Sequence, residues 1–193
     1  MDNNFSLSAL IRSRRSTRRF QEQSVSRALL LQCVEAARLA PSAENSQPWR
    51  FFIVDDPACK DTLAQKAFGG VFLPTRWAAA APVLVVLCLQ TDSIAKRMVS
   101  KVAGTTFSMI DIGIAGEHFC LQAEELGLGT CWIGWFDKKG AQQALKLDKR
   151  FQPVIMLAVG YPLDSNRRPG KRKDLDEICF FNQGEKPPHL PPS

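Results

Sequence analysis

The sequence predicts a single α+β domain, and three features of the chain lead to that prediction. Its 193 residues suffice for one sizeable hydrophobic core but are few for two. Two uninterrupted apolar runs of strand length, residues 82–89 and 154–161, alternate with segments of helical periodicity. The chain contains neither an internal repeat nor an interdomain linker. We therefore predict one domain over residues 1–193, with a basic loop and a proline-rich arm from about residue 162.

The first predicted helix covers residues 28–39. Ser26 is placed to cap its start, and Pro41 stops it because the residue before a proline avoids the α conformation. Aromatic and β-branched residues then predict a strand over 49–54. Pro57 suits the first turn of the helix that follows.

A long helix is predicted over residues 106–126, after a strand over 82–89 that is apolar throughout and therefore central. The helix is apolar on nearly all sides, which indicates a buried helix at the centre of the molecule or in a dimer interface. Gly127 and Gly129 are expected to end it. Its apolar positions are Phe107, Ile110, Ile114 and Leu121 on one face, with Ile112, Ala115 and Phe119 beside them.

The last third of the chain is expected to begin with a strand or loop over residues 130–135. Asp137 then caps a short helix to Leu145, and residues 154–161 form another buried strand. The prolines of residues 187–192 exclude helix and central strand, so this end is predicted to be an extended arm or a loose tail.

Composition narrows the class of protein. Apolar residues make up 45% of the chain and charged residues 23%, which is ordinary for a soluble domain. No run reaches the roughly 18 apolar residues that cross a bilayer, and the N-terminus lacks a secretory pattern. We therefore expect a cytoplasmic protein without membrane association. The six cysteines include no Cys-x-x-Cys pair, so we expect them to be buried and free of disulfides. With only two histidines in the chain, we also expect no metal site.

The net charge of +6 raises the alternative of a nucleic-acid partner. Ten of the 25 basic residues gather in two clusters, around residues 12–19 and 167–173. Apart from Phe20 at one edge, neither cluster is interleaved with aromatic side chains, which disfavours a platform for single strands. Solvated basic faces explain the charge without any partner, and no nucleic acid is expected.

Two short segments carry the clearest signs of a ligand. Residues 14–18 offer three guanidinium groups and a hydroxyl within five residues, which suits a phosphate. Residues 40–49 are small, polar and stiffened by proline, so the amides of this segment, with Ser42 and Asn45, can face a flat polar ligand. A heteroaromatic molecule with a phosphate tail fits both segments, and we predict a nucleotide-like cofactor.

Other catalytic patterns are absent from the sequence. The Gly-Leu-Gly at 127–129 resembles the start of a dinucleotide fingerprint, but Trp132 occupies the third glycine position. There is neither a Walker sequence nor a G-x-S-x-G elbow. Glu117 and His118 suggest acid–base catalysis, yet within a buried helix a satisfied core or interface histidine is the better expectation.

Four segments, in this order, resemble the nitroreductase family of FMN-dependent oxidoreductases, in its short form. They are residues 14–18, 41–49, 126–136 and the basic Lys171-Arg172-Lys173. The resemblance extends from about residue 10 to residue 181. It implies a central, mostly antiparallel sheet flanked by helices, and an intertwined homodimer whose flavins lie at the subunit interface.

The resemblance also implies which residues hold FMN. Basic residues from both ends of the chain would surround its phosphate, with Arg172 the first choice among residues 171–173. The flavin ring would meet the backbone after Ile133, where the N–H of Gly134 donates to N5 and the next amide reaches O4. The implied cofactor-binding residues are Arg14, Arg15, Ser16, Arg18, Pro41, Ser42, Ala43, Asn45, Arg76, Trp132, Ile133, Gly134, Trp135, Lys171, Arg172 and Lys173.

Some of these positions keep an alternative. Many relatives carry an acidic residue where this chain has Gly134, so only its backbone role is implied. Arg76 falls where relatives have a cation near flavin N1 and O2, but a surface role is open as well. Trp132 and Trp135 can instead fill the core, and for Trp49 the core is the preferred interpretation.

The resemblance implies an enzyme that transfers hydride in two steps. NADH or NADPH first gives hydride to flavin N5, and the reduced flavin then passes it, by a ping-pong mechanism, to a nitroaromatic, a quinone or an activated alkene. The cofactor would carry the chemistry, so neither a catalytic side chain nor a metal is expected. One alternative is an FMN enzyme specialised for one metabolite. Another, from a different class, is a non-catalytic basic module that binds nucleic acid or another polyanion.

Overall fold

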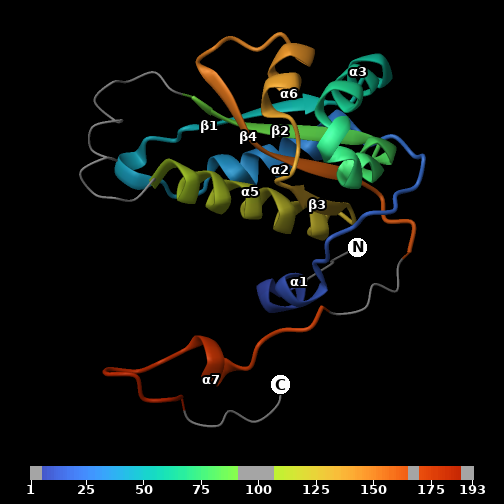
Figure 1. Cartoon of the computed structure of the whole chain (residues 1–193). Helices are drawn as coiled ribbons and strands as arrows, with labels where there is room; N and C mark the ends of the chain where they lie inside the picture. The colour runs from blue at the N-terminus through green and yellow to red at the C-terminus, as the bar shows by residue number, and fades with distance from the viewer. Residues whose placement is uncertain (1–5, 91–106, 165–169, 188–193) are drawn as a thin grey trace.

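The computed structural model describes residues 6–90, 107–164 and 170–187, and its centre is a four-stranded sheet in the order β1-β2-β4-β3 (Figure 1). Each neighbouring pair of these strands is antiparallel. The predicted α+β class and antiparallel sheet are therefore confirmed. The strands are β1 (Trp49–Val54), β2 (Val83–Gln90), β3 (Gly129–Ile133) and β4 (Phe151–Gly160).

The central strand β2 places apolar side chains on both faces of the sheet, so other elements must pack against both faces. Its first six residues are all buried, as its uninterrupted apolar sequence predicts. Because side chains alternate along a strand, Val83, Val85 and Leu87 join one hydrophobic core, and Leu84, Val86 and Cys88 join a second core on the opposite face.

Helices α2 (Arg27–Arg38) and α5 (Phe107–Glu125) cover the first face of the sheet. The predicted cap of α2 is confirmed, since the Ser26 hydroxyl accepts a hydrogen bond from Leu29 N at 3.4 Å. The helix ends before Pro41, as expected.

The second face is covered by α3 (Pro57–Ala67), the 3₁₀ segment η2 (Gly70–Ala80) and α6 (Lys138–Ala144). Asp56 caps α3, and Asp137 caps α6 by accepting from Gly140 N at 3.0 Å. The predicted helix after Pro57 and the predicted cap at Asp137 are both confirmed, whereas η2 was not predicted.

The C-terminus of α5 corrects one expectation. Gly127 adopts φ +75°, its N–H donates to Glu124 O at 3.0 Å, and Leu128 N donates to Ala123 O at 2.8 Å. These bonds form a Schellman motif, which needs one left-handed residue. Gly129 takes no part in ending the helix, because it is the first residue of β3.

The expectation that α5 is buried on nearly all sides is wrong for the single chain. Ile112, Ala115 and Phe119 are buried against the sheet, but Phe107 and Ile110 are 43% and 51% exposed. His118 is also exposed, so it is not a core histidine. Among the described residues, no helix is long and apolar enough to cross a membrane.

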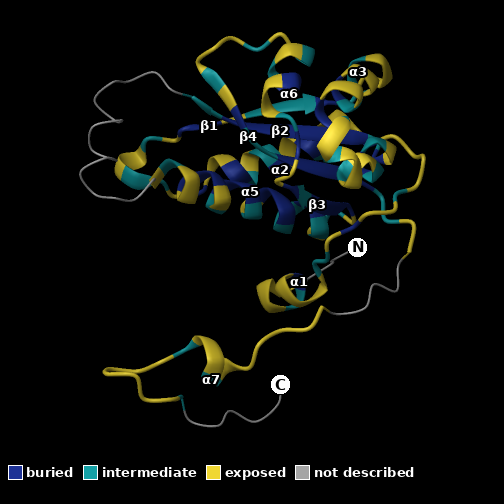
Figure 2. Cartoon of the chain, viewed as in Figure 1, coloured by how far each residue is buried: buried dark blue, intermediate teal, exposed yellow. Residues whose placement is uncertain are grey.

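Both ends of the described chain lie outside the layered body (Figure 2). The short helices α1 (Leu7–Ser13) and α7 (Leu175–Ile178) were not predicted. The segment around α7 is extended and mostly exposed, in line with a basic, loop-like end. Residues 188–193 of the proline-rich arm, and the cluster members Arg167 and Arg168, lie outside the described residues.

Candidate cofactor-binding site

The arginine-rich segment is held against the sheet by backbone pairing. Ser16 forms a parallel bridge with Thr130, and Thr17 N donates to Thr130 O at 2.8 Å. Thr17 is buried beside Gly129, where any side chain on the glycine would overlap the threonine. The segment therefore extends the β3 edge of the sheet, and Gly129 makes the close approach possible.

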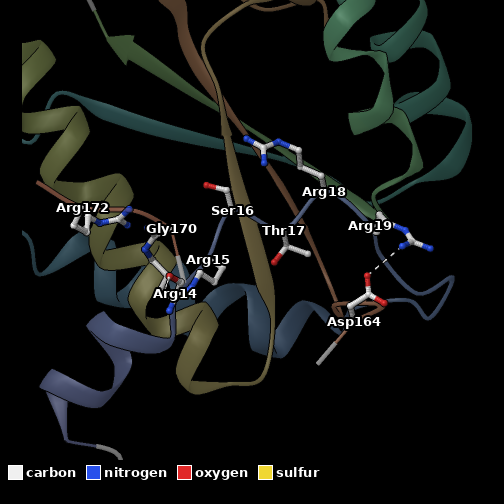
Figure 3. Close-up of a pocket in the computed structure, with 9 residues that line it drawn as sticks. All are labelled: Arg14, Arg15, Ser16, Thr17, Arg18, Arg19, Asp164, Gly170 and Arg172. Atoms are coloured by element: carbon white, nitrogen blue, oxygen red, sulfur yellow. Dashed lines mark hydrogen bonds and ion pairs between the residues drawn. The ribbon is translucent and has the colours of Figure 1, made fainter. Parts of the chain in front are cut away.

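This segment forms most of a cavity of about 450 Å³ (Figure 3). The cavity joins the two ends of the chain, as the predicted phosphate site requires. Five of its nine lining residues are arginines and one is a carboxylate, which gives it a strongly positive potential. The lining residues are Arg14, Arg15, Ser16, Thr17, Arg18, Arg19, Asp164, Gly170 and Arg172.

Arg14 and Arg15 are fixed by the protein around them. Arg14 Nε lies 3.1 Å from the Glu117 carboxylate on α5. Arg15 Nη1 donates to the carbonyl oxygens of Arg12 and Arg14, at the end of α1. Arg15 Nε is buried and has no hydrogen-bond partner among the described residues. An anion at this place would supply the acceptor that the protein lacks.

Arg18 and Arg19 face different surroundings, although both line the cavity. The guanidinium of Arg18 lies over the ring of Trp77, 5.8 Å from its centroid. Arg19 Nη1 donates to the Asp164 carboxylate at 3.3 Å, and both side chains are largely exposed. In Figure 3 the guanidinium of Arg18 lies apart from Arg14 and Arg15. Arg18 therefore lines the same cavity as these two arginines, but its guanidinium is placed over Trp77.

The basic residues near the C-terminus are partly brought to the cavity. Arg172 lines it, and its Nη1 donates to Lys171 O at 3.2 Å. Lys171 and Lys173 are exposed and do not line it. Arg172 is thus the residue of this triplet that meets the arginines of the other end of the chain.

Residues 41–45 lie elsewhere: none of them lines the cavity. Pro41 and Asn45 are exposed, and Ser42 and Ala43 are half-buried. The expectation that the amides of this segment face a ligand is wrong for four of them, which bond within the protein. Ala43 N donates to Asp111 Oδ1 at 3.1 Å, Asn45 N to Ser42 O at 3.0 Å, Ser46 N to Ala43 O at 3.0 Å, and Gln47 N to Ser42 Oγ at 3.0 Å.

The same segment has an unusual backbone. Glu44, Asn45 and Gln47 have positive φ of 54°, 52° and 42°, around the short 3₁₀ turn η1 (Ala43–Asn45). Asparagine tolerates this region, but each strained residue typically costs about 1–3 kcal/mol. Such conformations persist where the surrounding structure fixes them, and they gather at functional sites.

The third expected part of the site lies at the end of β3. Gly134 is exposed, and a Cβ there would meet nothing within 4 Å among the described residues. This open space leaves room for a ligand beside the backbone. Ile133, just before it, is buried in the core, so it offers a ligand only its backbone.

The two tryptophans and Arg76 have distinct environments. The ring of Trp132 packs on Gly116 of α5, which favours its interpretation as a core residue. Trp135 is 61% exposed and held on η2, because its Nε1 donates to Val71 O at 3.2 Å and its carbonyl accepts from the Thr75 hydroxyl at 2.9 Å. Arg76 is exposed and does not line the cavity.

Several site residues escaped the sequence analysis. Trp77 under Arg18 and Asp164 beside Arg19 are brought in by tertiary packing alone. Glu117 was considered from the sequence only for acid–base catalysis, and Asp111 was not singled out. In the structure Glu117 pairs with Arg14, and the buried carboxylate of Asp111 has the partner it needs because it accepts from Ala43 N.

Three of the cysteines are deeply buried in the hydrophobic cores. Burial raises the pKa of Cys33, Cys88 and Cys120 to about 12. Within the part of the chain that the structure describes, no group of three or more His, Cys, Asp or Glu is placed to hold a metal ion.

Comparison with known proteins identifies the family. The model of the nitroreductase family matches residues 11–161, and the chain belongs to that family. An NADH dehydrogenase of Thermus thermophilus is 46% identical, over 87% of this chain and 92% of the relative. An FMN reductase [NAD(P)H] of Bacillus subtilis is 26% identical, over 91% of this chain and 75% of the relative.

A solved structure agrees with the observed fold. The nitroreductase family protein from Streptococcus pneumoniae superposes with a TM-score of 0.76 at 26% identity, covering 92% of this chain and 100% of that one. The chain is therefore an oxidoreductase of the nitroreductase family, and the fold expected from the sequence motifs is confirmed.

Proposed function

We propose that this protein is an FMN-dependent oxidoreductase that acts as a homodimer in the cytoplasm. It takes hydride from NADH or NADPH and passes it, in a ping-pong cycle, to a nitroaromatic, a quinone or an activated alkene. Bound FMN supplies the hydride chemistry, and the protein supplies binding, orientation and charge.

The arginine-lined cavity carries the proposal. A phosphate monoester takes up to two negative charges and offers several acceptor oxygens, which suits neighbouring guanidinium groups. The residues present fit this group, because Arg15 Nε is buried without an acceptor among the described residues and the Ser16 side chain is exposed at the cavity. Arg14, Arg15, Ser16 and Arg172 would hold the phosphate.

The remaining site residues would serve the ring. The backbone N–H of Gly134 and Trp135 would donate to its reactive edge, beside the space left open at Gly134. Arg18 would place positive charge near the ring instead of at the phosphate, since its guanidinium lies over Trp77, next to Arg76 in the chain. We assign no side chain to proton transfer or nucleophilic attack.

The position of residues 41–45 supports a site shared between two chains. These residues do not line the arginine cavity of their own chain. The exposed apolar side chains of α5, including Phe107 and Ile110, offer a surface for a second subunit close to Asp111, which holds this segment. In the proposed homodimer, Ser42 and Asn45 of one chain would contact the flavin held by the arginines of the other.

An anaerobic absorbance spectrum tests the proposal. The purified protein, supplied with FMN, is expected to retain the visible flavin band through desalting, to lose it on addition of NADH or NADPH, and to regain it with a nitroaromatic or a quinone. Failure to retain any flavin would contradict the proposal. If the protein retains flavin but neither NADH nor NADPH bleaches the flavin band, the proposed reductants are wrong.

Arg18→Ala is expected to weaken FMN binding by roughly ten- to a hundredfold, because charged hydrogen bonds typically contribute about 1.5–3 kcal/mol. Arg38→Ala is the matched control: its charge is paired with Glu35, its side chain is exposed and it does not line the cavity, so little change is expected. The measurement is the dissociation constant of FMN from quenching of flavin fluorescence. Equal effects of the two substitutions would show that Arg18 has no special contact with the cofactor.

A further inference from the structure

Gln47 lies at the centre of the hydrogen bonds that shape the segment after α2. Its N–H donates to Ser42 Oγ at 3.0 Å, and its carbonyl accepts from Arg50 Nη1 at 3.0 Å. Its side-chain Nε2 donates to Asn45 Oδ1 at 2.9 Å. Gln47 has a φ of 42°, a left-handed backbone that glutamine rarely adopts, and its backbone N–H and C=O are both hydrogen-bonded in this conformation.

The bond to Asn45 gives that side chain a direction. An asparagine amide has one acceptor end and one donor end. The side-chain Nε2 of Gln47 lies 2.9 Å from Asn45 Oδ1 and 3.5 Å from the backbone oxygen of Asn45, so the donor end of Gln47 faces two acceptors and occupies Oδ1. Among the described residues none accepts a hydrogen bond from Asn45 Nδ2. The exposed Asn45 therefore offers a ligand its N–H groups.

The segment that carries Asn45 is anchored to the helix beneath it. Ala43 N donates to Asp111 Oδ1 at 3.1 Å, and Asp111 is only 4% exposed. A hydrogen bond between a buried carboxylate and a backbone amide is strong, because little water competes for either group. Asp111 thus anchors the turn that carries Asn45 and Gln47.

We propose that Gln47 is a positioning residue that commits Asn45 to donate, through Nδ2, to an acceptor atom on the ring of the bound cofactor. The proposal rests on the proposed function, because it takes the ligand beside Asn45 to be an oxidised flavin. Such a ring presents carbonyl oxygens and imine nitrogens, which accept hydrogen bonds. A single donor from Asn45 would help to select the ring's orientation.

Two substitutions of nearly equal size separate this role from a structural one. In Gln47→Glu the carboxylate accepts only, so it would bond to Nδ2 of Asn45 and turn Oδ1 toward the ligand. In Gln47→Leu the amide of Asn45 is left free to rotate into either orientation. We expect Gln47→Glu to raise the dissociation constant of FMN by about tenfold, and Gln47→Leu by no more than about threefold.

The experiment measures FMN binding to the full-length protein by fluorescence titration, at low salt and at about 1 M salt, where charges are screened within roughly 3 Å. The difference between the variants is expected to persist at high salt, which separates amide orientation from the added charge. Before FMN is added, the side-chain amide signals of Asn45 in the NMR spectrum are expected to shift in Gln47→Glu, with unchanged melting temperature.

Equal dissociation constants for Gln47→Glu and Gln47→Leu, or a difference that disappears at high salt, would overturn the role of Gln47 while leaving the proposed function intact. Failure of the unmodified protein to bind FMN would instead overturn the proposed function, and this inference with it. If Gln47→Glu melts at a lower temperature, the variant Asn45→Asp replaces it. That variant keeps the acceptor for Gln47 and removes the donor, so it is expected to lose affinity as well; unchanged affinity would contradict the inference.

Discussion

Replacing Arg15 with methionine is expected to weaken FMN binding by about a hundredfold, the largest effect of any single side chain. Arg15 lines the cavity, and its buried Nε has no acceptor among the described residues, so a phosphate oxygen would be its partner. Methionine keeps the length and packing of the side chain while removing the charge and every donor. The measurement is the dissociation constant of FMN, with the melting temperature of the flavin-free protein beside it.

Arg12→Met is the matched control for this prediction. Arg12 precedes Arg15 by three residues, is exposed and does not line the cavity. Its contact with Arg15 uses the backbone carbonyl, which the substitution keeps. If the two variants lose affinity equally, general positive potential explains binding, and the assignment of Arg15 to the phosphate is wrong.

The second large effect is expected from Gly129→Ala. The new methyl group would overlap the side chain of buried Thr17, which is paired with the sheet through Thr130. Overpacking of this kind typically costs about 1–3 kcal/mol of stability. Because Thr17 lies inside the arginine segment, we also expect weaker FMN binding. Denaturant unfolding of the flavin-free protein and FMN titration measure the two effects.

Two further variants show whether the overlap is the cause. At Gly69 a Cβ has only one ordinary contact, 3.4 Å from Gln65 O, so Gly69→Ala should leave stability and binding nearly unchanged. In the double variant with Thr17→Ala, two of the three overlapping atoms are removed, and part of the lost stability should return. Strict additivity of Gly129→Ala and Thr17→Ala would contradict the proposed contact.

The sequence predicted those elements whose signals are local. The cap at Ser26, the strand over residues 49–54 and the helix after Pro57 depend on neighbouring residues, and all three are confirmed. The 3₁₀ segment η2 depends instead on distant partners, such as the bond between the Thr75 hydroxyl and Trp135 O. No local pattern could have predicted it.

The same distinction explains what the sequence revealed of the site. The arginine segment was recognisable because its cations are adjacent in the chain, and the structure brings Arg172 to them. The direction of Arg18 toward Trp77, and the pairing of Ser16 with Thr130, join residues far apart in sequence. Residues 41–45 were recognised by composition, but the partners that occupy their amides, including Asp111, were visible only in the structure.

Complementation between defective subunits tests most directly whether two chains form each flavin site. Arg15→Met damages the phosphate end and Asn45→Ala the ring contact, so each homodimer should bind FMN weakly. When the two chains are produced together, about half of the dimers are mixed, and each mixed dimer regains one intact site of two. We predict that about one quarter of the normal number of tight FMN sites returns. If no tight sites return, or a single chain holds FMN as a stable monomer, the two-chain site is wrong.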